Sequence, residues 1–245
     1  MKRVEEFHRE DKRRTAFSFH HSGILQQKKG NYREAEKLYS KSLEIFKELS
    51  DKPGIASSLH QLGMIRQEKG DYEGAEKFYK DSSEILKDLG DKLGVAISLH
   101  QLGMLQQSRG NYREAEKLYN ESLAIKKEFG DKRGIAIALH QLGMVQQNRG
   151  NYEEAERLYK ESLQLKKELG DREGIAKSLY NLGKIQQDRR NYKEAIQAFS
   201  EAASIFKELE SPYLEDVIRG LAKIEDEIGK NECDKIFKSL SKSFS

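Results

Sequence analysis

The chain has 245 residues, of which 35% are charged and 36% hydrophobic, with two prolines and no tryptophan. Its 44 basic and 41 acidic residues leave a net charge of +3, too balanced to indicate a nucleic-acid or membrane partner. The single Cys233 excludes an intramolecular disulfide framework, no apolar run approaches the roughly 18 residues of a membrane span, and the charged start lacks a signal peptide's apolar core. We therefore expect a cytoplasmic protein in a reducing compartment.

The first residues, 1–14, are dense in charge and predict an N-terminal extension of the first helix or a small cap. The hexapeptide Leu-His-Gln-Leu-Gly-Met then stands at 59–64, 99–104 and 139–144, a spacing of forty residues. A period of this size is typical of supersecondary units that bury their apolar faces only by stacking on their neighbours.

Each period predicts two helices, which we call the A helix and the B helix. The A helices are expected near 15–29, 54–69, 94–109, 134–149 and 174–190, and the B helices near 32–49, 71–89, 111–129, 151–169 and 191–208. Glycine followed by Asn or Asp, as in Gly30-Asn31 and Gly90-Asp91, suits a positive φ after one helix and a side-chain cap on the next. The predicted repeats are 15–50, 51–90, 91–130, 131–170 and 171–209.

The pattern degenerates after residue 210. Ser211-Pro212 predicts the start of a sixth A-type helix, in which Ala222 replaces the repeat glycine, and a short helix follows from about 232 to 243. Atypical ends are expected because the last repeat has no neighbour to cover it. We therefore assign 210–245 to a degenerate sixth repeat with C-terminal capping helices.

Small and aromatic residues recur at fixed places in every repeat. The second repeat holds Leu62-Gly63, Gly70, Tyr72, Ala75 and Tyr79, and the equivalents are Gly23, Ala35 and Tyr39; Gly103, Ala115 and Tyr119; Gly143, Ala155 and Tyr159; and Gly183, Ala195 and Phe199. This pattern resembles the signature of the tetratricopeptide repeat (TPR) family over about residues 15–230. The resemblance implies an all-α fold, a right-handed α-solenoid, or superhelix, of helix-turn-helix units.

Two departures from the family pattern stand out. The period of forty exceeds the family's usual length of about 34 residues, and in this the chain is similar to the Pins/LGN-like adaptors, the kinesin light chains and the prokaryotic TPR regulators. An A-helix position that is usually aromatic holds Gln26, Arg66, Gln106, Gln146 and Gln186. The sequence alone offers no physical account of these residues.

The resemblance also implies where a ligand binds, because TPR A helices line a concave groove. Four positions around each repeat glycine face into it, and carried onto this chain they form four rows. The rows are His20, His60, His100, His140 and Tyr180; His21, Gln61, Gln101, Gln141 and Asn181; Ile24, Met64, Met104, Met144 and Lys184; and Gln27, Gln67, Gln107, Gln147 and Gln187.

The chemistry of these rows favours a largely uncharged peptide or helix as the ligand. Methionine repacks against different partners at little cost, while Gln and His hydrogen-bond a peptide backbone in either polarity. Simpler alternatives stay open: the methionines fill gaps between A helices, and the glutamines bond to one another. Four histidines in register also suggest a metal or a pH switch, but no Cys or carboxylate joins their row, so we predict no metal.

No motif for catalysis or for a cofactor is present: the sequence lacks a phosphate-binding glycine loop, an H-E-x-x-H pair and a nucleophile with its base. Acid–base pairs on the B helices, such as Glu76–Lys80, indicate a solvated outer face. Lys177 and Lys184 occur only at the far end of the groove, which argues against a ligand held by its C-terminal carboxylate.

We therefore predict a non-catalytic interaction scaffold whose partner is another protein or a peptide segment. Nucleic-acid and membrane partners are not expected. Two alternatives stay open. One is a structural assembly formed by head-to-tail self-association, because nearly identical repeats make the end surfaces resemble internal ones. The other is a peptide- or pH-responsive regulator, suggested by the histidine row.

Overall fold

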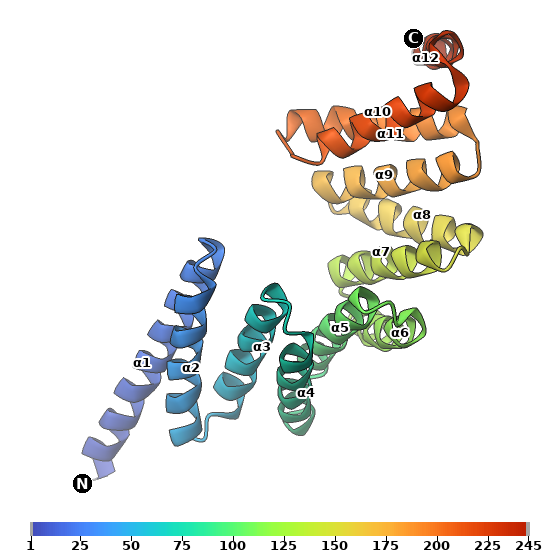
Figure 1. The fold of residues 1–245 in the computed structure, drawn as a ribbon. Coiled ribbons are helices and arrows are strands. Elements are labelled where there is room, and N and C mark those ends of the chain that lie inside the picture. The colour runs from blue at the N-terminus through green and yellow to red at the C-terminus, as the bar shows by residue number, and fades with distance from the viewer. Residues whose placement is uncertain (1, 244–245) are drawn as a thin grey trace. The chain divides into compact units, whose positions relative to one another are not determined.

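The computed structural model describes residues 2–243 of the chain, with side chains described for residues 5–239. Within this range the chain forms twelve α-helices and no strand (Figure 1). The first six are α1 (Lys2–Lys28), α2 (Tyr32–Glu48), α3 (Lys52–Glu68), α4 (Tyr72–Asp88), α5 (Lys92–Ser108) and α6 (Tyr112–Glu128). The others are α7 (Lys132–Asn148), α8 (Tyr152–Glu168), α9 (Arg172–Asp188), α10 (Tyr192–Glu208), α11 (Leu214–Ile228) and α12 (Lys230–Ser243). The predicted all-α repeat solenoid is confirmed.

The helices fall into two compact units, which divide between Ile125 and Lys126. Unit 1 holds α1 to α5 with most of α6, and unit 2 holds α7 to α12. Within each unit an A helix packs against the B helix that follows it, and that B helix packs against the next A helix. The charged N-terminal stretch is the first half of α1, where Lys12 pairs with Glu48 at 2.9 Å.

The connections between α1 and α10 are three residues long, and the second residue after each of the helices α1 to α10 has a positive φ. Glycine takes this place in most connections, for example Gly70 with φ 77°, because a residue without Cβ adopts the left-handed region without steric penalty. Ser50, Arg190 and Glu210 occupy the same place with φ of 54°, 61° and 50°. The predicted turn is therefore conserved in geometry even where the glycine is replaced.

The residue after this turn is the N-cap, and Asp and Asn act differently there: Asp71 before the B helix α4 caps through its carboxylate, as the Asp residues before A helices do. Before A helices it is Asp, and the carboxylate of Asp171, for example, accepts the backbone N–H of Gly174 at 2.9 Å. Before α2 it is Asn31, whose side chain makes no capping bond, so the predicted cap is wrong in that respect. Instead its Nδ2 donates to Gln26 Oε1 at 2.8 Å.

This contact accounts for the A-helix glutamines that the sequence left unexplained. Gln106, Gln146 and Gln186 accept from Asn111, Asn151 and Asn191 in the same way. In the second repeat both partners change together, and Arg66 donates to Asp71 at 3.2 Å. The pair therefore ties the end of each A helix to the start of its B helix.

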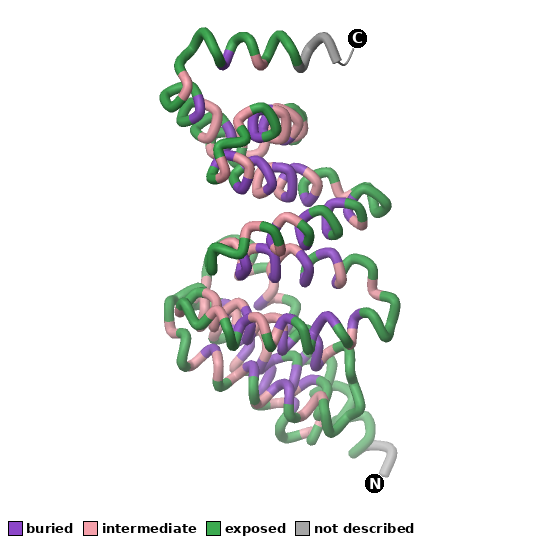
Figure 2. The backbone as a smooth tube through the Cα atoms, turned by 90° about the vertical axis from the view of Figure 1, so that its right-hand side faces the viewer, coloured by how far each residue is buried: buried purple, intermediate pink, exposed green. Residues whose placement is uncertain are grey.

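The core of each repeat is built on a close approach between a glycine and an aromatic ring. A Cβ on Gly63 would lie 2.7 Å from Cε1 of Tyr79, whose side chain is fully buried. The equivalent pairs are Gly23 with Tyr39, Gly103 with Tyr119, Gly143 with Tyr159 and Gly183 with Phe199. A buried serine one turn further along the B helix, such as Ser82, donates to an A-helix carbonyl, here Ala56 O at 2.9 Å. Figure 2 shows the buried positions along the middles of the helices and the exposed ones at their connections.

We expect Arg190→Gly to raise the free energy of unfolding by about 1 kcal/mol, because glycine removes the steric penalty of the left-handed backbone. Urea titration followed by circular dichroism measures this change. Arg190→Ala is the matched control, since it removes the side chain and keeps the penalty. A glycine variant no more stable than the alanine variant contradicts the prediction.

Candidate functional site: two cavities on the A helices

Some residues of the predicted rows line a cavity in unit 1. This unit 1 cavity has a volume of about 410 Å³ and is lined by α1, α2 and α3. Four of the predicted groove residues contribute to its wall: Ile24, Gln27, Gln61 and Met64. Lys28, Tyr32 and Glu68 complete the lining.

A second cavity, of about 510 Å³, lies in unit 2, and we call it the unit 2 cavity. Five predicted residues line it: His140, Gln141 and Met144 from α7, and Tyr180 and Asn181 from α9. The remaining lining residues were not in the predicted rows. They are Ile137, Lys166, Asp171, Glu173, Gly174, Lys177, Phe206, Tyr213 and Asp216.

The other predicted residues lie along the A helices outside the linings of these two cavities. They are His20, His21, His60, Gln67, His100, Gln101, Met104, Gln107, Gln147, Lys184 and Gln187. His21 and Lys184 are exposed, whereas His20 and Gln187 are buried. The structure therefore brings only part of the predicted set together, and the groove as a whole stays a prediction.

The histidine row packs on the aromatic rings of the B helices. His60 lies 5.4 Å from Tyr79 between ring centroids, His140 lies 5.2 Å from Tyr159, and His20 and His100 repeat the arrangement with Tyr39 and Tyr119. Burial lowers the pKa of His20, His60 and His140 below that of a free imidazole. Among the described residues, no group of three or more His, Cys, Asp or Glu side chains could hold a metal ion.

The last glutamine row bonds to the same tyrosines. Tyr79 donates its hydroxyl to Gln67 Oε1 at 3.0 Å, and Gln27, Gln107 and Gln147 accept from Tyr39, Tyr119 and Tyr159. In the fifth repeat Phe199 has no hydroxyl, and Gln187 donates instead to Gly220 O at 3.4 Å. The bonds between glutamines that were one alternative are replaced by bonds to tyrosine.

The methionines of the third predicted row are half-buried, and so are the glutamines of the second row. These residues are Met64, Met104 and Met144, and Gln61, Gln101 and Gln141. Met64 and Met144 pack at the edge of the hydrophobic core and also line the two cavities. A methionine in this position both fills space between helices and presents a polarisable surface to a cavity. The two interpretations left open by the sequence are therefore compatible.

Both ring nitrogens of His140, in the wall of the unit 2 cavity, have a hydrogen-bond partner. Asn181 Nδ2 lies 3.3 Å from Nε2, and Ser178 Oγ lies 3.5 Å from Nδ1. A donating amide at Nε2 places the ring proton on Nδ1, which points to the serine oxygen. Burial, together with the positive charges of Lys166 and Lys177, lowers the pKa of His140 to about 3.

Among the lining residues that the predicted rows missed, Lys166 is the buried cation. It is only 4% exposed, and its ammonium donates to Ser178 Oγ at 3.0 Å. Burial lowers the pKa of Lys166 to about 8. The signal was present in the repeats, because the equivalent positions are Phe46, Leu86, Lys126 and Phe206. A cation at a place that is otherwise apolar distinguishes the third and fourth repeats.

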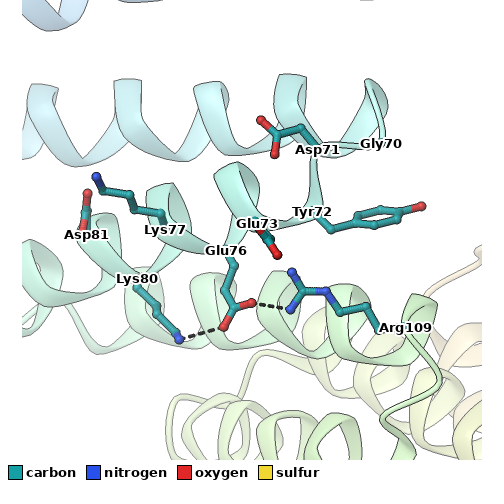
Figure 3. A pocket seen from close by; sticks show the side chains of 9 residues that line it. All are labelled: Gly70, Asp71, Tyr72, Glu73, Glu76, Lys77, Lys80, Asp81 and Arg109. Atoms are coloured by element: carbon teal, nitrogen blue, oxygen red, sulfur yellow. Dashed lines mark hydrogen bonds and ion pairs between the residues drawn. The ribbon is translucent and has the colours of Figure 1, made fainter.

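A third cavity, of about 860 Å³, has a different character (Figure 3). It lies between α4 and Arg109 at the end of α5, and three of its charged groups are paired with one another. Glu76 contacts both Arg109 and Lys80, and Glu156 contacts Arg189 and Lys160 in the same way. Such pairs link a B helix to the next A helix, so this cavity lies at the boundary between two repeats.

Comparison with known families agrees with the repeat geometry. The family model of the tetratricopeptide repeat matches residues 14–88, 54–128 and 134–208. The chain belongs to the tetratricopeptide repeat family. Among curated proteins, none matches the TPR chain significantly.

Solved TPR-like structures share the fold at low sequence identity. BtubC (BKLC) from P. vanneervenii is 21% identical with a TM-score of 0.69, covering 77% of this chain and 78% of its own. A putative kinesin light chain of Podospora anserina with nearly identical TPR-like repeats is 20% identical with a TM-score of 0.65, covering 81% and 97%. A Rap protein complexed with competence and sporulation factor is 14% identical with a TM-score of 0.71, covering 93% and 70%. None of the TPR helices described here is long and apolar enough to cross a membrane.

We expect this TPR protein to lose stability as the pH falls below about 6.5, with His140 contributing. The folded ring stays neutral down to about pH 3, whereas the unfolded ring binds a proton near 6.5, so unfolding takes up a proton between these values. Each such ring lowers the free energy of unfolding by at most about 1.4 kcal/mol per pH unit. Urea titrations at pH 7.5, 6.5 and 5.5 measure the slope. His140→Gln should reduce it, and equal slopes in both proteins contradict the prediction.

We also expect Lys166→Met to stabilise the TPR fold by about 2 kcal/mol at pH 7. The change removes the cost of burying an ammonium without an ion-pair partner and keeps an aliphatic stem at a place where other repeats have Phe or Leu. Thermal and urea unfolding measure the difference. Lys160→Met, on the exposed side of the same helix, is the control and should change stability by less than about 0.5 kcal/mol. A clear loss of stability in Lys166→Met is the contradicting result.

Proposed function

We propose that this TPR protein is a non-catalytic interaction scaffold that binds a segment of another protein, extended or helical, on its A helices. One observation carries the proposal: predicted residues from α7 and α9 converge on the unit 2 cavity. Apolar side chains such as Ile137 and Met144 line it together with the amides of Gln141 and Asn181. Mixed apolar and hydrogen-bonding walls are typical of ligand sites.

The two cavities differ in the chemistry of their walls. The unit 1 cavity joins Ile24 and Met64 to the amides of Gln27 and Gln61, which favours an uncharged side chain. The Gln61 amide can donate to a backbone carbonyl or accept from a backbone N–H, whereas the Gln27 oxygen already accepts from Tyr39. The neutral state of His140 extends the uncharged character to part of the unit 2 cavity.

The structural comparison supports a peptide-type ligand. The Rap conjugation gene regulator of the plasmid pLS20, which shares this fold at a TM-score of 0.66, is in complex with the Phr* peptide. Control by pH through the histidine row finds no support, because burial lowers the pKa of His20, His60 and His140. The His140 ring, whose pKa is lowered to about 3, stays neutral in the range where a free imidazole titrates.

We expect Met144→Glu to abolish the binding of peptides selected on the wild-type protein from a random display library. The new carboxylate would stand among apolar side chains of the unit 2 cavity and disfavour an apolar ligand group. Fluorescence anisotropy with the selected peptides measures the loss, expected to exceed 30-fold, or about 2 kcal/mol.

Leu89→Glu is the matched control, because Leu89 is 41% exposed and lies outside both cavities. It adds the same charge and should bind the peptides as the wild type does. Equal affinity for the Met144→Glu and Leu89→Glu proteins, with both fully helical, refutes the unit 2 cavity as the binding site.

A further inference from the structure

We propose that the unit 2 cavity is a recognition site for a carboxylate side chain, an Asp or Glu of the bound segment, and that Lys166 binds it. The inference rests on the proposed function, since it names the chemistry of the segment that the same cavity holds. It also changes the sequence prediction, which favoured a largely uncharged ligand throughout.

The Lys166 ammonium is incompletely paired. An ammonium carries three N–H donors, and one of them donates to Ser178 Oγ at 3.0 Å. No ion pair with Lys166 is formed by the residues that the structure describes, although the side chain is 4% exposed. Two donors of a buried cation therefore remain for a ligand that lies in the cavity.

The acidic groups around the cavity are already engaged. Glu173 pairs with Lys177 at 2.7 Å, and Asp216 pairs with Arg219 at 3.1 Å. Asp171 accepts the backbone N–H of Gly174 at 2.9 Å, and its charge favours the protonated form of Lys166 without touching it. His140 is neutral. Of the positively charged residues that line this cavity, Lys166 is thus the one that forms no ion pair with a described residue.

Packing does not require a lysine at this place. Phe46 and Phe206 fill the equivalent positions in the first and fifth repeats and are 1% exposed, and the second repeat has Leu86. A buried cation that an apolar residue could replace lowers stability, and such costs concentrate at functional sites. Binding an anion is a function that the ammonium of a residue in a cavity wall can serve.

The depth of Lys166 favours a side-chain carboxylate over a chain terminus. The other charged residues of the lining are half-buried or exposed, so Lys166 is the most deeply placed of them. Gln141 and Asn181, whose half-buried amides can bond to a peptide backbone, line the same cavity as Lys166, so a segment held by them can present a side-chain carboxylate there. Lys177 is occupied by Glu173 and lies 4.7 Å over the ring of Tyr213, which leaves one cation for one carboxylate.

The first test uses small probes and the whole chain, labelled with ¹³C at the lysine ε-carbons, with the Lys166 signal assigned by its loss in Lys166→Met. N-acetyl-aspartate N-methylamide should shift this signal saturably and raise its titration midpoint by at least half a pH unit. The isosteric asparagine compound should leave it unchanged. Equal responses to both compounds, or none, overturn the inference. A response confined to N-acetylglycine assigns the site to a C-terminal carboxylate and also overturns it.

The second test uses peptides selected on the wild-type protein from a random library. We expect Asp or Glu at one fixed position, and a tenfold or greater loss of affinity when this residue becomes Asn or Gln. Against Lys166→Met the acidic and amide peptides should bind equally. Lys160→Met is the matched control from the exposed side of α8 and should keep the preference of the wild type.

These results separate the two proposals. Selected peptides that depend on Met144 but show no acidic preference support the scaffold and overturn the carboxylate site. A Lys166 signal that responds only to the aspartate compound, without any peptide that depends on Met144, supports the carboxylate site and overturns the scaffold.

Discussion

The close approach of a glycine on each A helix to an aromatic ring on its B helix determines the rest of this structure. The ring of Tyr79 lies where any side chain on Gly63 would have to be. The ring of His60 packs against the ring of Tyr79, and the Tyr79 hydroxyl donates to Gln67. When Phe199 replaces the tyrosine, Tyr180 takes the histidine place, and Gln187 donates to Gly220 O instead of accepting from a tyrosine. Two of the four predicted ligand rows therefore have a structural role.

The structural role of these two rows reduces the number of A-helix residues that are available to a ligand. The histidine rings and the oxygens of the last glutamine row are engaged inside each repeat, so the methionine row and the second row supply the adaptable surface. These two rows differ little between repeats two, three and four. Discrimination between ligands then falls to residues that break the repetition, such as Lys166, Tyr180 and Lys184, all of which belong to unit 2.

Much of the fold could be predicted from the sequence, because the forty-residue period places each helix and each turn. Asp171 before α9 behaves as its residue type predicts, whereas Asn31 before α2 does not. The Asn31 amide bonds to Gln26, five residues upstream, whereas Asp71 bonds to Arg66 at the same spacing and still caps Gly74. The co-variation of Arg66 with Asp71 could have revealed this pair.

The site was predicted in part: His140 and Met144 line a cavity, but Lys166 was assigned to the B helix and so overlooked. The reason for that omission is geometric. Family rules assign ligand contact to A helices, and a lysine on a B helix is expected on the outer face. Lys166 points inward because it occupies the position of Phe46 and Phe206, whose rings fill the space beneath the following A helix. A long flexible stem can cross the same space and bring a charge to the opposite side. Variation at an interior position of a repeat protein can thus alter its ligand surface while every surface residue stays the same.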